Sequence, residues 1–244
     1  MKRLFALVYG IVCYLIFFPT FLYLFGFMGD LWVPYSVSRG GEPAAGFGAV
    51  FVNLGLIALF GVQHSVMARP TFKQWWTGIV PKPVERSTFV LITSVILILT
   101  YAFWRPMPGE LWNLSGTLAA PVLWTVFAAG ALIVFASSFM INHFDLFGLR
   151  QVVLYFQGKE YTSVPFRVIG FYKWVRNPLM LGFLLTLWAA PVMTWSRLLY
   201  AAGMTLYIII GMYFEERNIA EALGEPYHAY KASTSMILPK IKLK

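Results

Sequence analysis

The sequence predicts an all-α integral membrane protein: a helical bundle of four full spans followed by a C-terminal helical hairpin, giving five to six transmembrane segments. Hydrophobic residues make up 59% of the 244 residues and charged residues only 12%, whereas soluble domains carry about a quarter charged residues. Apolar runs recur at about the 20-residue length that a helix needs to cross a bilayer. Lys and Arg gather in alternate connections between these runs.

The first four spans follow from uninterrupted apolar runs. The first run begins after Lys2 and Arg3, is too long for a signal peptide and lacks a small-residue cleavage site, so we expect a retained signal anchor. The single cysteine, Cys13, lies in this run, which excludes an intrachain disulfide, and the chain has no C-x-x-C metal motif. The runs cover residues 4–28, 47–68, 88–104 and 118–141.

The fifth apolar region, residues 179–214, is interrupted by the sequence PVMTWSR at residues 191–197. Its first limb, residues 179–190, is too short to cross a bilayer upright. The region therefore predicts a helical hairpin that either crosses twice or dips into the membrane and returns. The connection before it contains a predicted short strand or amphipathic segment at residues 152–156.

Charge distribution predicts the orientation. With the N-terminus inside, 16 of the 19 Lys and Arg residues fall in inside segments, leaving Arg39, Arg105 and Arg197 outside. The positive-inside rule then places both termini in the cytoplasm. The net charge of +9 is explained by topology and by contact with anionic lipid, so we expect membrane lipid and not nucleic acid as a partner. We expect one domain over 1–244, with parts at 1–141, 142–178 and 179–244.

The histidines and most carboxylates lie at the predicted cytoplasmic ends of the spans, where they can converge into one polar pocket. Charges also gather at membrane interfaces because Lys and Arg side chains extend toward water. Glu215 and Glu216 are about 100° apart on a helix, so at least one faces the bundle and needs a cationic partner, for which Arg176 is the candidate. Asn177 is a good N-cap residue, and Pro178 suits the first helical position.

Several spaced segments resemble known membrane methyltransferases. The sequence RNPLMLG from Arg176, the sequence EER from Glu215, and GEPY with Tyr230 resemble the C-terminal signature of the isoprenylcysteine carboxyl methyltransferase and phospholipid methyltransferase superfamily. The segments QHSVMARP, ERS and NHFDLFGLRQ resemble the bacterial methanethiol S-methyltransferases and, in part, NnrU-like proteins. The superfamily usually has His where this chain has Asn177, which can hydrogen-bond but cannot carry charge.

The resemblance implies methylation of methanethiol, or of another small thiol, to dimethyl sulfide by in-line transfer from S-adenosylmethionine. It also implies a bacterial inner-membrane location with the active site at the cytoplasmic face. Arginine suits the cofactor carboxylate, glutamate its ammonium group, and tyrosine its adenine or sulfonium, although tyrosines also mark membrane interfaces. The implied cofactor-binding residues are Tyr172, Arg176, Asn177, Pro178, Leu181, Gly182, Glu215, Glu216, Arg217, Tyr227 and Tyr230.

The reaction requires a thiolate, since the thiol itself is a weak nucleophile. His64 and His143 are candidate catalytic bases because histidine titrates near neutral pH, and Asp145 is a candidate to orient either of them. Structural roles for both histidines, and a desolvated site without a dedicated base, are the alternatives. We expect no metal, because the three histidines lie on separate segments without paired spacing.

Two other functions remain open at this stage. NADPH-dependent membrane sterol reductases have a similar hairpin, but they usually carry an acidic residue after the glycine, where this chain has Phe183 after Gly182. A non-catalytic NnrU-like accessory role is favoured by Asn177. Binding of S-adenosylmethionine, of NADPH or of neither compound distinguishes the three functions.

Overall fold

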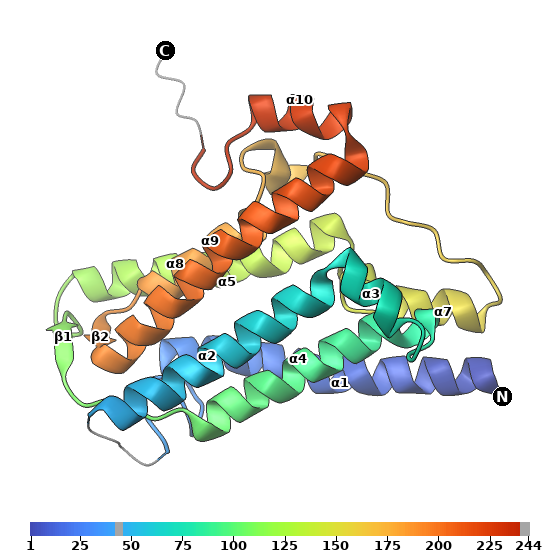
Figure 1. Ribbon diagram of the computed structural model, residues 1–244. Helices are drawn as coiled ribbons and strands as arrows, with labels where there is room; N and C mark the ends of the chain where they lie inside the picture. Colours follow the sequence, from blue (N-terminus) through green and yellow to red (C-terminus); the bar gives the residue numbers. More distant parts are fainter. Residues whose placement is uncertain (42–45, 240–244) are drawn as a thin grey trace. The chain divides into compact units, whose positions relative to one another are not determined.

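The computed structural model describes residues 1–41 and 46–239 and is predominantly helical in these ranges (Figure 1). Two short strands, β1 (Glu110–Asn113) and β2 (Val192–Thr194), pair with each other. The helices are α1 (Lys2–Gly29), α2 (Phe47–Ala68), α3 (Pro70–Trp76), α4 (Lys82–Phe103), α5 (Ala119–Ile141), α6 (His143–Leu146), α7 (Leu149–Phe156), the 3-10 helix η1 (Gly170–Lys173), α8 (Pro178–Trp188), α9 (Trp195–Leu223) and α10 (Glu225–Ser233).

Within the described ranges, α1, α2, α4, α5 and α9 are long and apolar enough to cross a membrane, and α8 is a shorter apolar helix. The prediction of an all-α integral membrane protein is confirmed. Helix α4 begins at Lys82 rather than at residue 88, because proline early in the helix and Glu85 in its first turn favour a helix start. The strand alternative at residues 152–156 is wrong, since α7 forms there with one buried face.

The chain forms two compact units. The first comprises Met1–Gly109, Asn142–Pro165 and Thr194–Arg197. The second comprises Glu110–Ile141, Phe166–Met193 and Leu198–Lys244. The fourth predicted span, α5, therefore belongs to the same unit as the hairpin. The single functional domain expected over 1–244 stays a prediction.

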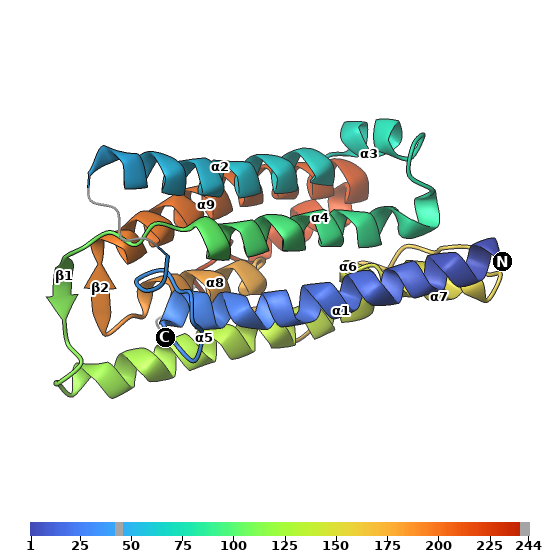
Figure 2. The same cartoon turned by 90° about the horizontal axis from the view of Figure 1, so that it is seen from below.

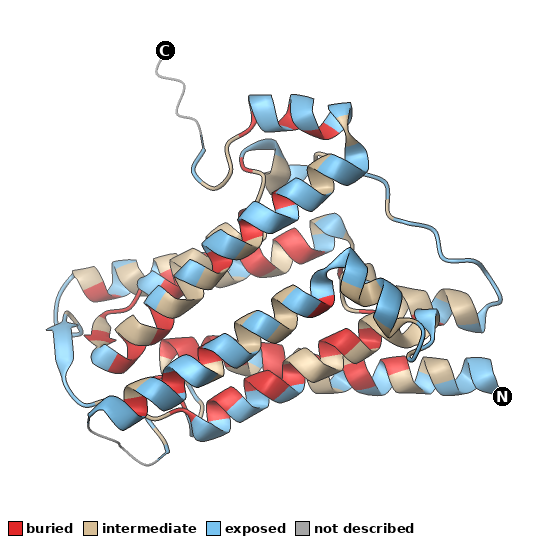
Figure 3. Ribbon diagram, viewed as in Figure 1, coloured by how far each residue is buried: buried red, intermediate tan, exposed pale blue. Residues whose placement is uncertain are grey.

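In the first unit, α1 and α4 run side by side, α2 packs on α4, and α7 contacts both α1 and α4 (Figure 2). Aromatic side chains fill the space between α1 and α4, where Phe27 contacts Tyr101 and Trp104. Large apolar side chains such as Phe5 and Phe51 are exposed, and exposed positions extend along much of α2 (Figure 3). This distribution is expected for helices that are surrounded by lipid instead of water.

In the second unit, α5 packs closely against α8 at two glycines. A Cβ atom on Gly182 would lie 2.6 Å from the carbonyl oxygen of Gly130, and a Cβ on Gly130 would lie 2.8 Å from that of Gly182. Only residues without side chains permit such an approach of two membrane helices. Gly182 is thus required for packing, whatever else it does.

The short limb of the hairpin is completed by extended chain. An 11-residue helix such as α8 is about 16 Å long, roughly half the hydrocarbon thickness. The segment after it reaches strand β2, which pairs with β1 just before α5 begins. An extended residue adds about 3.3 Å, so this segment supplies the missing length. The pairing favours a hairpin that crosses the membrane fully over one that dips and returns.

Candidate cofactor-binding site

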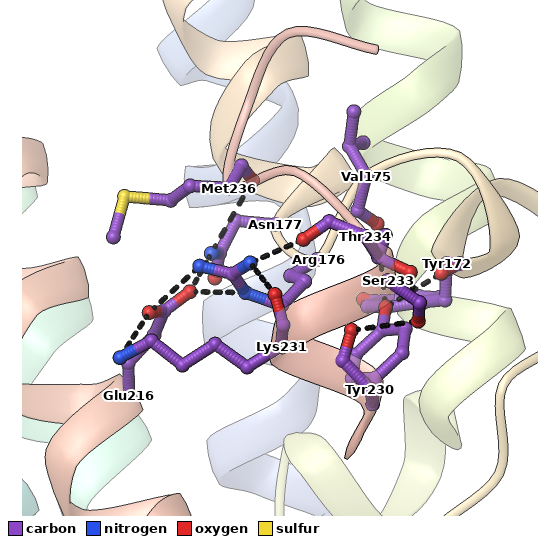
Figure 4. Close-up of polar contacts among 10 residues, drawn as sticks. All are labelled: Tyr172, Val175, Arg176, Asn177, Glu216, Tyr230, Lys231, Ser233, Thr234 and Met236. Atoms are coloured by element: carbon purple, nitrogen blue, oxygen red, sulfur yellow. Dashed lines mark hydrogen bonds and ion pairs between the residues drawn. The ribbon is translucent and has the colours of Figure 1, made fainter. Parts of the chain in front are cut away.

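A buried ion pair lies at the open end of the hairpin, which we call its mouth, where α8 begins and α9 approaches its end (Figure 4). The Arg176 Nε donates to Glu216 Oε1 at 2.7 Å, and Nη2 donates to Oε2 at 3.0 Å. The two side chains are only 7% and 3% exposed. Glu215, the neighbouring residue on α9, is exposed. The prediction that one carboxylate of this pair turns inward to meet Arg176 is confirmed.

Asn177 contributes to the same cluster in an unexpected way. It occupies the N-cap position of α8, and Pro178 follows in the first turn, but the Asn177 side chain does not cap the helix. Its Nδ2 instead donates to Glu216 Oε1 at 3.3 Å and to the Met236 carbonyl at 3.5 Å. Side-chain capping by Asn177 is therefore wrong, because the buried carboxylate offers the amide a charged acceptor.

The C-terminal tail closes over this cluster. The backbone N–H groups of Arg176 and Asn177 donate to the carbonyls of Ser235 and Met236 at 2.8 and 3.1 Å. The third guanidinium nitrogen, Nη1 of Arg176, donates to the carbonyls of Lys231 and Thr234. Each nitrogen of the Arg176 side chain thus has a protein acceptor. Arg176 joins the tail to α9.

The cluster has an excess of positive charge. Lys231 Nζ lies 3.5 Å from Glu216 Oε2, and its side chain is 48% exposed. Two cations therefore surround one buried carboxylate. Burial opposes the charged form of Arg176, yet the hydrogen bonds and negative charge of Glu216 hold the Arg176 pKa above its ordinary value.

Tyrosines form the wall beside the ion pair. The Tyr230 hydroxyl donates to the Tyr172 carbonyl at 2.5 Å, and the Tyr230 ring meets Tyr227 and Phe166 edge to face. Burial raises the pKa of Tyr230 to about 12 and also raises the pKa of Tyr172 and Tyr227. All three therefore remain protonated at neutral pH and offer hydroxyl groups and aromatic faces but no negative charge.

The other predicted cofactor residues are placed differently. Pro178, Leu181 and Gly182 form the first turns of α8, where Gly182 packs against α5. The Arg217 side chain is 67% exposed and pairs with Glu221 on the same helix at 2.9 Å. The structure thus does not bring Arg217 into the buried cluster.

His143 lies in a buried aromatic setting in the first unit. Its Nε2 is 2.9 Å from the Tyr14 hydroxyl, and its ring centroid is 4.8 Å from that of Phe147. The residue is only 2% exposed, and burial lowers the pKa of His143. The preceding residue, Asn142, has a φ of 153°, a strained value for a residue with a side chain. A neutral imidazole held in this way can accept a proton.

Asp145 anchors the segment that follows His143. Its carboxylate accepts from Arg150 Nη1 at 2.9 Å and from the Tyr161 hydroxyl at 3.2 Å, while Gln151 Nε2 donates to its backbone carbonyl at 3.0 Å. These contacts tie α6 to α7 and to the chain beyond it. The predicted role of Asp145 in orienting a histidine stays a prediction.

His64, on α2, packs between aromatic rings of the same unit. Its centroid lies 5.4 Å from that of Phe60 and 4.9 Å from that of Phe89 on α4. The Arg86 guanidinium lies 4.8 Å from the Phe89 centroid and donates from Nε to the Leu146 carbonyl at 2.7 Å. Through α4, His64 is thus connected to the segment that contains His143.

Sequence reasoning missed several members of these groups. Lys231 lies on the same face of α10 as Tyr227, four residues earlier, and this spacing is a signal that could have identified it. Tyr14 lies in a uniformly apolar run, so no local pattern indicates its contact with His143. Among residues 1–41 and 46–239, His, Cys, Asp and Glu do not form a group of three that could hold a metal ion.

The fold and the cluster define a helical integral membrane protein whose hairpin mouth holds an ion pair beside tyrosines. The chain is 49% identical to the methanethiol S-methyltransferase of Mycobacterium tuberculosis, over 98% of both chains. It is 48% identical to methanethiol S-methyltransferase 1 of Bradyrhizobium diazoefficiens, over 96% of this chain and 82% of the relative. It is 41% identical to the methanethiol S-methyltransferase of Crocosphaera subtropica, over 100% of this chain and 95% of the relative. No family model and no solved structure matches the chain. The chain belongs to the methanethiol S-methyltransferase family.

Proposed function

We propose that this protein transfers the methyl group of S-adenosylmethionine to the sulfur of methanethiol and releases dimethyl sulfide. Near full-length relatives named methanethiol S-methyltransferase support methyl transfer to this thiol. These relatives favour methyl transfer over an NADPH-dependent reductase and over a non-catalytic NnrU-like accessory protein. The structural observation that carries the cofactor assignment is the buried Arg176–Glu216 pair, closed by Asn177 and the C-terminal tail.

The donor set of this cluster fits the cofactor. Glu216 Oε2 meets the half-exposed Lys231 at 3.5 Å, a loose contact that the ammonium group of the cofactor can replace, and Lys231 is then left to meet a carboxylate. The tyrosine wall offers aromatic faces to adenine or to a sulfonium. Because the guanidinium of Arg176 is already engaged, we assign to it the positioning of Glu216 and the tail rather than the binding of the cofactor carboxylate. When bound, S-adenosylmethionine would supply a methyl group on a positively charged sulfur. The thiolate sulfur would bond to the methyl carbon in line as the methyl–sulfonium bond breaks, and S-adenosylhomocysteine would leave as a neutral thioether.

The thiol must lose its proton as the new carbon–sulfur bond forms. We assign His143 as the proton acceptor, since its imidazole is neutral and the Tyr14 hydroxyl fixes the ring by a hydrogen bond at Nε2. His64 is the second candidate base. Asp145 anchors the segment that holds His143. A small apolar thiol partitions into lipid, so exclusion of water around the reacting sulfur suits a membrane enzyme.

We further propose that the protein lies in a bacterial inner membrane with both termini and the active site at the cytoplasmic face. The support for this orientation is the concentration of Lys and Arg in alternate connections. The termini, the ion pair and the α5–α7 connection all belong to the predicted cytoplasmic segments.

The test uses the full-length protein purified in detergent, with S-adenosylmethionine and methanethiol as substrates and dimethyl sulfide measured in the headspace. Cofactor binding is measured separately by calorimetry. We expect Glu216→Gln to weaken cofactor binding and to abolish product. The matched control is Glu225→Gln, which removes one exposed carboxylate from the first turn of α10 and should leave both readouts unchanged.

The readouts separate the parts of the proposal. Cofactor binding without product would reject methanethiol as the substrate and direct the assay to larger thiols. Product formation at the wild-type rate by Glu216→Gln would reject the cofactor assignment. Binding of NADPH instead of S-adenosylmethionine would reject methyl transfer.

A further inference from the structure

We propose that a cationic cavity in the first unit binds the headgroup of an anionic phospholipid that carries hydroxyl groups, such as phosphatidylglycerol. The cavity has a volume of about 370 Å³. It is formed where α1 and α4 begin and where α7 ends, and its lining includes Arg3, Lys82, Gln151 and Lys159. None of the residues that line the cavity is itself assigned to methyl transfer, although Gln151 and Tyr161 donate hydrogen bonds to Asp145, and the proposal does not depend on that assignment.

The charge of the lining selects an anion. Arg3, Lys82 and Lys159 are cationic, and Glu160 is the only acidic residue among the described residues that line the cavity. The Arg3 guanidinium lies 5.8 Å from the centroid of the Tyr155 ring. A net positive cavity with an arginine held against an aromatic ring suits a phosphodiester.

A buried acceptor inside the lining selects a headgroup with hydroxyls. The Nε2 of Gln151 donates to the Asp145 carbonyl, but Gln151 Oε1 is buried and accepts no hydrogen bond from any residue that the structure describes. A buried polar atom without a partner costs free energy that a bound donor can recover. A glycerol headgroup supplies such a hydroxyl donor, whereas phosphocholine does not.

The surroundings favour a lipid over a soluble phosphate. The cavity opens at the ends of two membrane spans, and α1 exposes Leu4, Phe5 and Val8 directly after Arg3. Acyl chains attached to a headgroup in the cavity can lie along these side chains. Tyrosine, which lines this cavity at Tyr155 and Tyr161, is enriched at membrane interfaces, and basic pockets between spans on the cytoplasmic side bind anionic lipid headgroups.

Gly158 leaves room for the Arg3 side chain in the lining of the cavity. Its φ of +74° favours glycine, and a Cβ at this position would lie 2.8 Å from Arg3 Nη1. The guanidinium therefore occupies space that any other residue would fill. The segment after α7 is shaped around this arginine.

The experiment measures thermal unfolding of the full-length protein in a neutral detergent with short-chain lipids. The ligands are dihexanoyl phosphatidylglycerol, the matched phosphatidic acid and phosphatidylcholine, and also sn-glycerol 3-phosphate and inorganic phosphate. We expect phosphatidylglycerol to raise Tm in a saturable way, phosphatidic acid to do so less, and the other three to have little effect.

Variants locate the effect. Removing one cavity charge in Arg3→Gln or Lys159→Gln should weaken the binding of phosphatidylglycerol, so that its half-saturating concentration rises about fivefold. The control is Lys2→Gln, which removes an equal charge from the same helix end without lining the cavity and should bind within about twofold of wild type. Gln151→Leu should remove the preference for phosphatidylglycerol over phosphatidic acid. Lys159→Gln lies in exposed chain, so it remains informative if Arg3→Gln fails to fold.

Three results would overturn the proposal. Equal stabilisation by phosphatidylcholine would indicate a general amphiphile effect. Equal stabilisation by glycerol 3-phosphate or phosphate would indicate a soluble-anion site. Equal behaviour of Lys159→Gln and Lys2→Gln would show that the cavity is not the binding site.

Discussion

Arg176 and Glu216 keep opposite charges together in a nearly buried position, so each depends on the other. Alanine at Arg176 would leave the buried carboxylate with the neutral amide of Asn177 at 3.3 Å and the half-exposed Lys231 at 3.5 Å. Breaking a buried pair from one side costs about 3–5 kcal/mol, because the remaining charge loses its compensation. We expect Arg176→Ala to lower Tm strongly and to abolish cofactor binding in calorimetry.

Lysine at the same position is a sharper test. Arg176→Lys keeps the charge but cannot reproduce the two parallel hydrogen bonds to Glu216 or the bonds to the tail. An intermediate Tm with weak cofactor binding would support the positioning role. The exposed Arg217→Ala serves as the stability control and should leave Tm almost unchanged. A similar loss of Tm in both alanine variants would contradict the special role of Arg176.

Asn177 stands where the superfamily usually has histidine, and its amide acts as a hydrogen-bond donor to Glu216. If donation is all that the position requires, Asn177→His should retain cofactor affinity between about pH 6 and 8, since both protonation states of histidine can donate. Asn177→Leu should lose affinity because the carboxylate loses a donor. The measurement is a calorimetric Kd at both ends of this range. Loss of binding in the histidine variant would show that the amide shape itself matters.

His143 predicts a particular pH dependence. Burial lowers the pKa of His143 from its ordinary value of about 6.5, so the neutral base persists to lower pH than an exposed histidine would allow. Activity limited by this base should remain constant down to about pH 6.5 and decline only at more acidic pH. Between the lowered pKa and about 6.5 the unfolded chain binds more protons, so stability also falls as the pH decreases.

The acid limb of the rate profile tests this assignment. Single-turnover rates of the wild type and of His143→Gln are compared across this range, with protein integrity checked at each pH. The variant should lose most of its rate and also the acid limb. Tyr14→Phe should keep the acid limb but shift the pH at which the rate declines, because it removes only the hydrogen bond between the Tyr14 hydroxyl and His143 Nε2. An unchanged acid limb in His143→Gln would exclude this residue as the base.

At the scale of elements, the packing of α5 on α8 depends on two glycines facing each other. Gly182→Ala would place a methyl group 2.6 Å from the Gly130 carbonyl oxygen, which forces the helices apart. Overpacking of this kind costs about 1–3 kcal/mol. We expect a clearly lower Tm and weaker cofactor binding, since α8 also carries Asn177 at its start.

Gly211 provides the matched control on α9. Apart from the backbone of its own helix, no atom of the residues that the structure describes would lie within 4 Å of a Cβ at this position. Alanine there should be neutral or stabilising by up to about 1 kcal/mol, because glycine inside a helix is unfavourable. Thermal unfolding of both variants in one detergent checks the pair. Equal effects of Gly182→Ala and Gly211→Ala would argue against the close α5–α8 contact.

At the scale of the whole molecule, the tip of the hairpin should reach the membrane surface opposite to the cytoplasm. Strand β2 pairs with β1, and β1 lies in a predicted outside connection. On a Cys13→Ala background, Thr194→Cys should react with a membrane-impermeant maleimide added outside intact cells. Ser115→Cys is the outside reference and Gln74→Cys the inside reference. Labelling of Thr194→Cys only after lysis would mean that the tip does not emerge.

Much of this architecture follows from local composition. Apolar runs of sufficient length predicted the spans, since only helices satisfy their backbone hydrogen bonds within lipid. The alternation of Lys and Arg predicted the orientation. The spacing of Arg176, Glu215 and Glu216 was sufficient to predict an ion pair across the hairpin. Helix boundaries were less accurate, as the early start of α4 shows, because polar residues at Glu85 and Arg86 conceal the first turn.

The sequence by itself therefore determined the membrane class, the spans and the place of the candidate site at the hairpin mouth, because these depend on run length and local charge. Only the tertiary structure decided that Glu216 rather than Glu215 turns inward, that the Asn177 amide bonds to Glu216 instead of capping α8, and that the C-terminal tail closes the cluster. It likewise decided that Tyr14 holds His143. These contacts join segments far apart in the chain, and their geometry depends on how helices pack, which no local pattern of residues encodes.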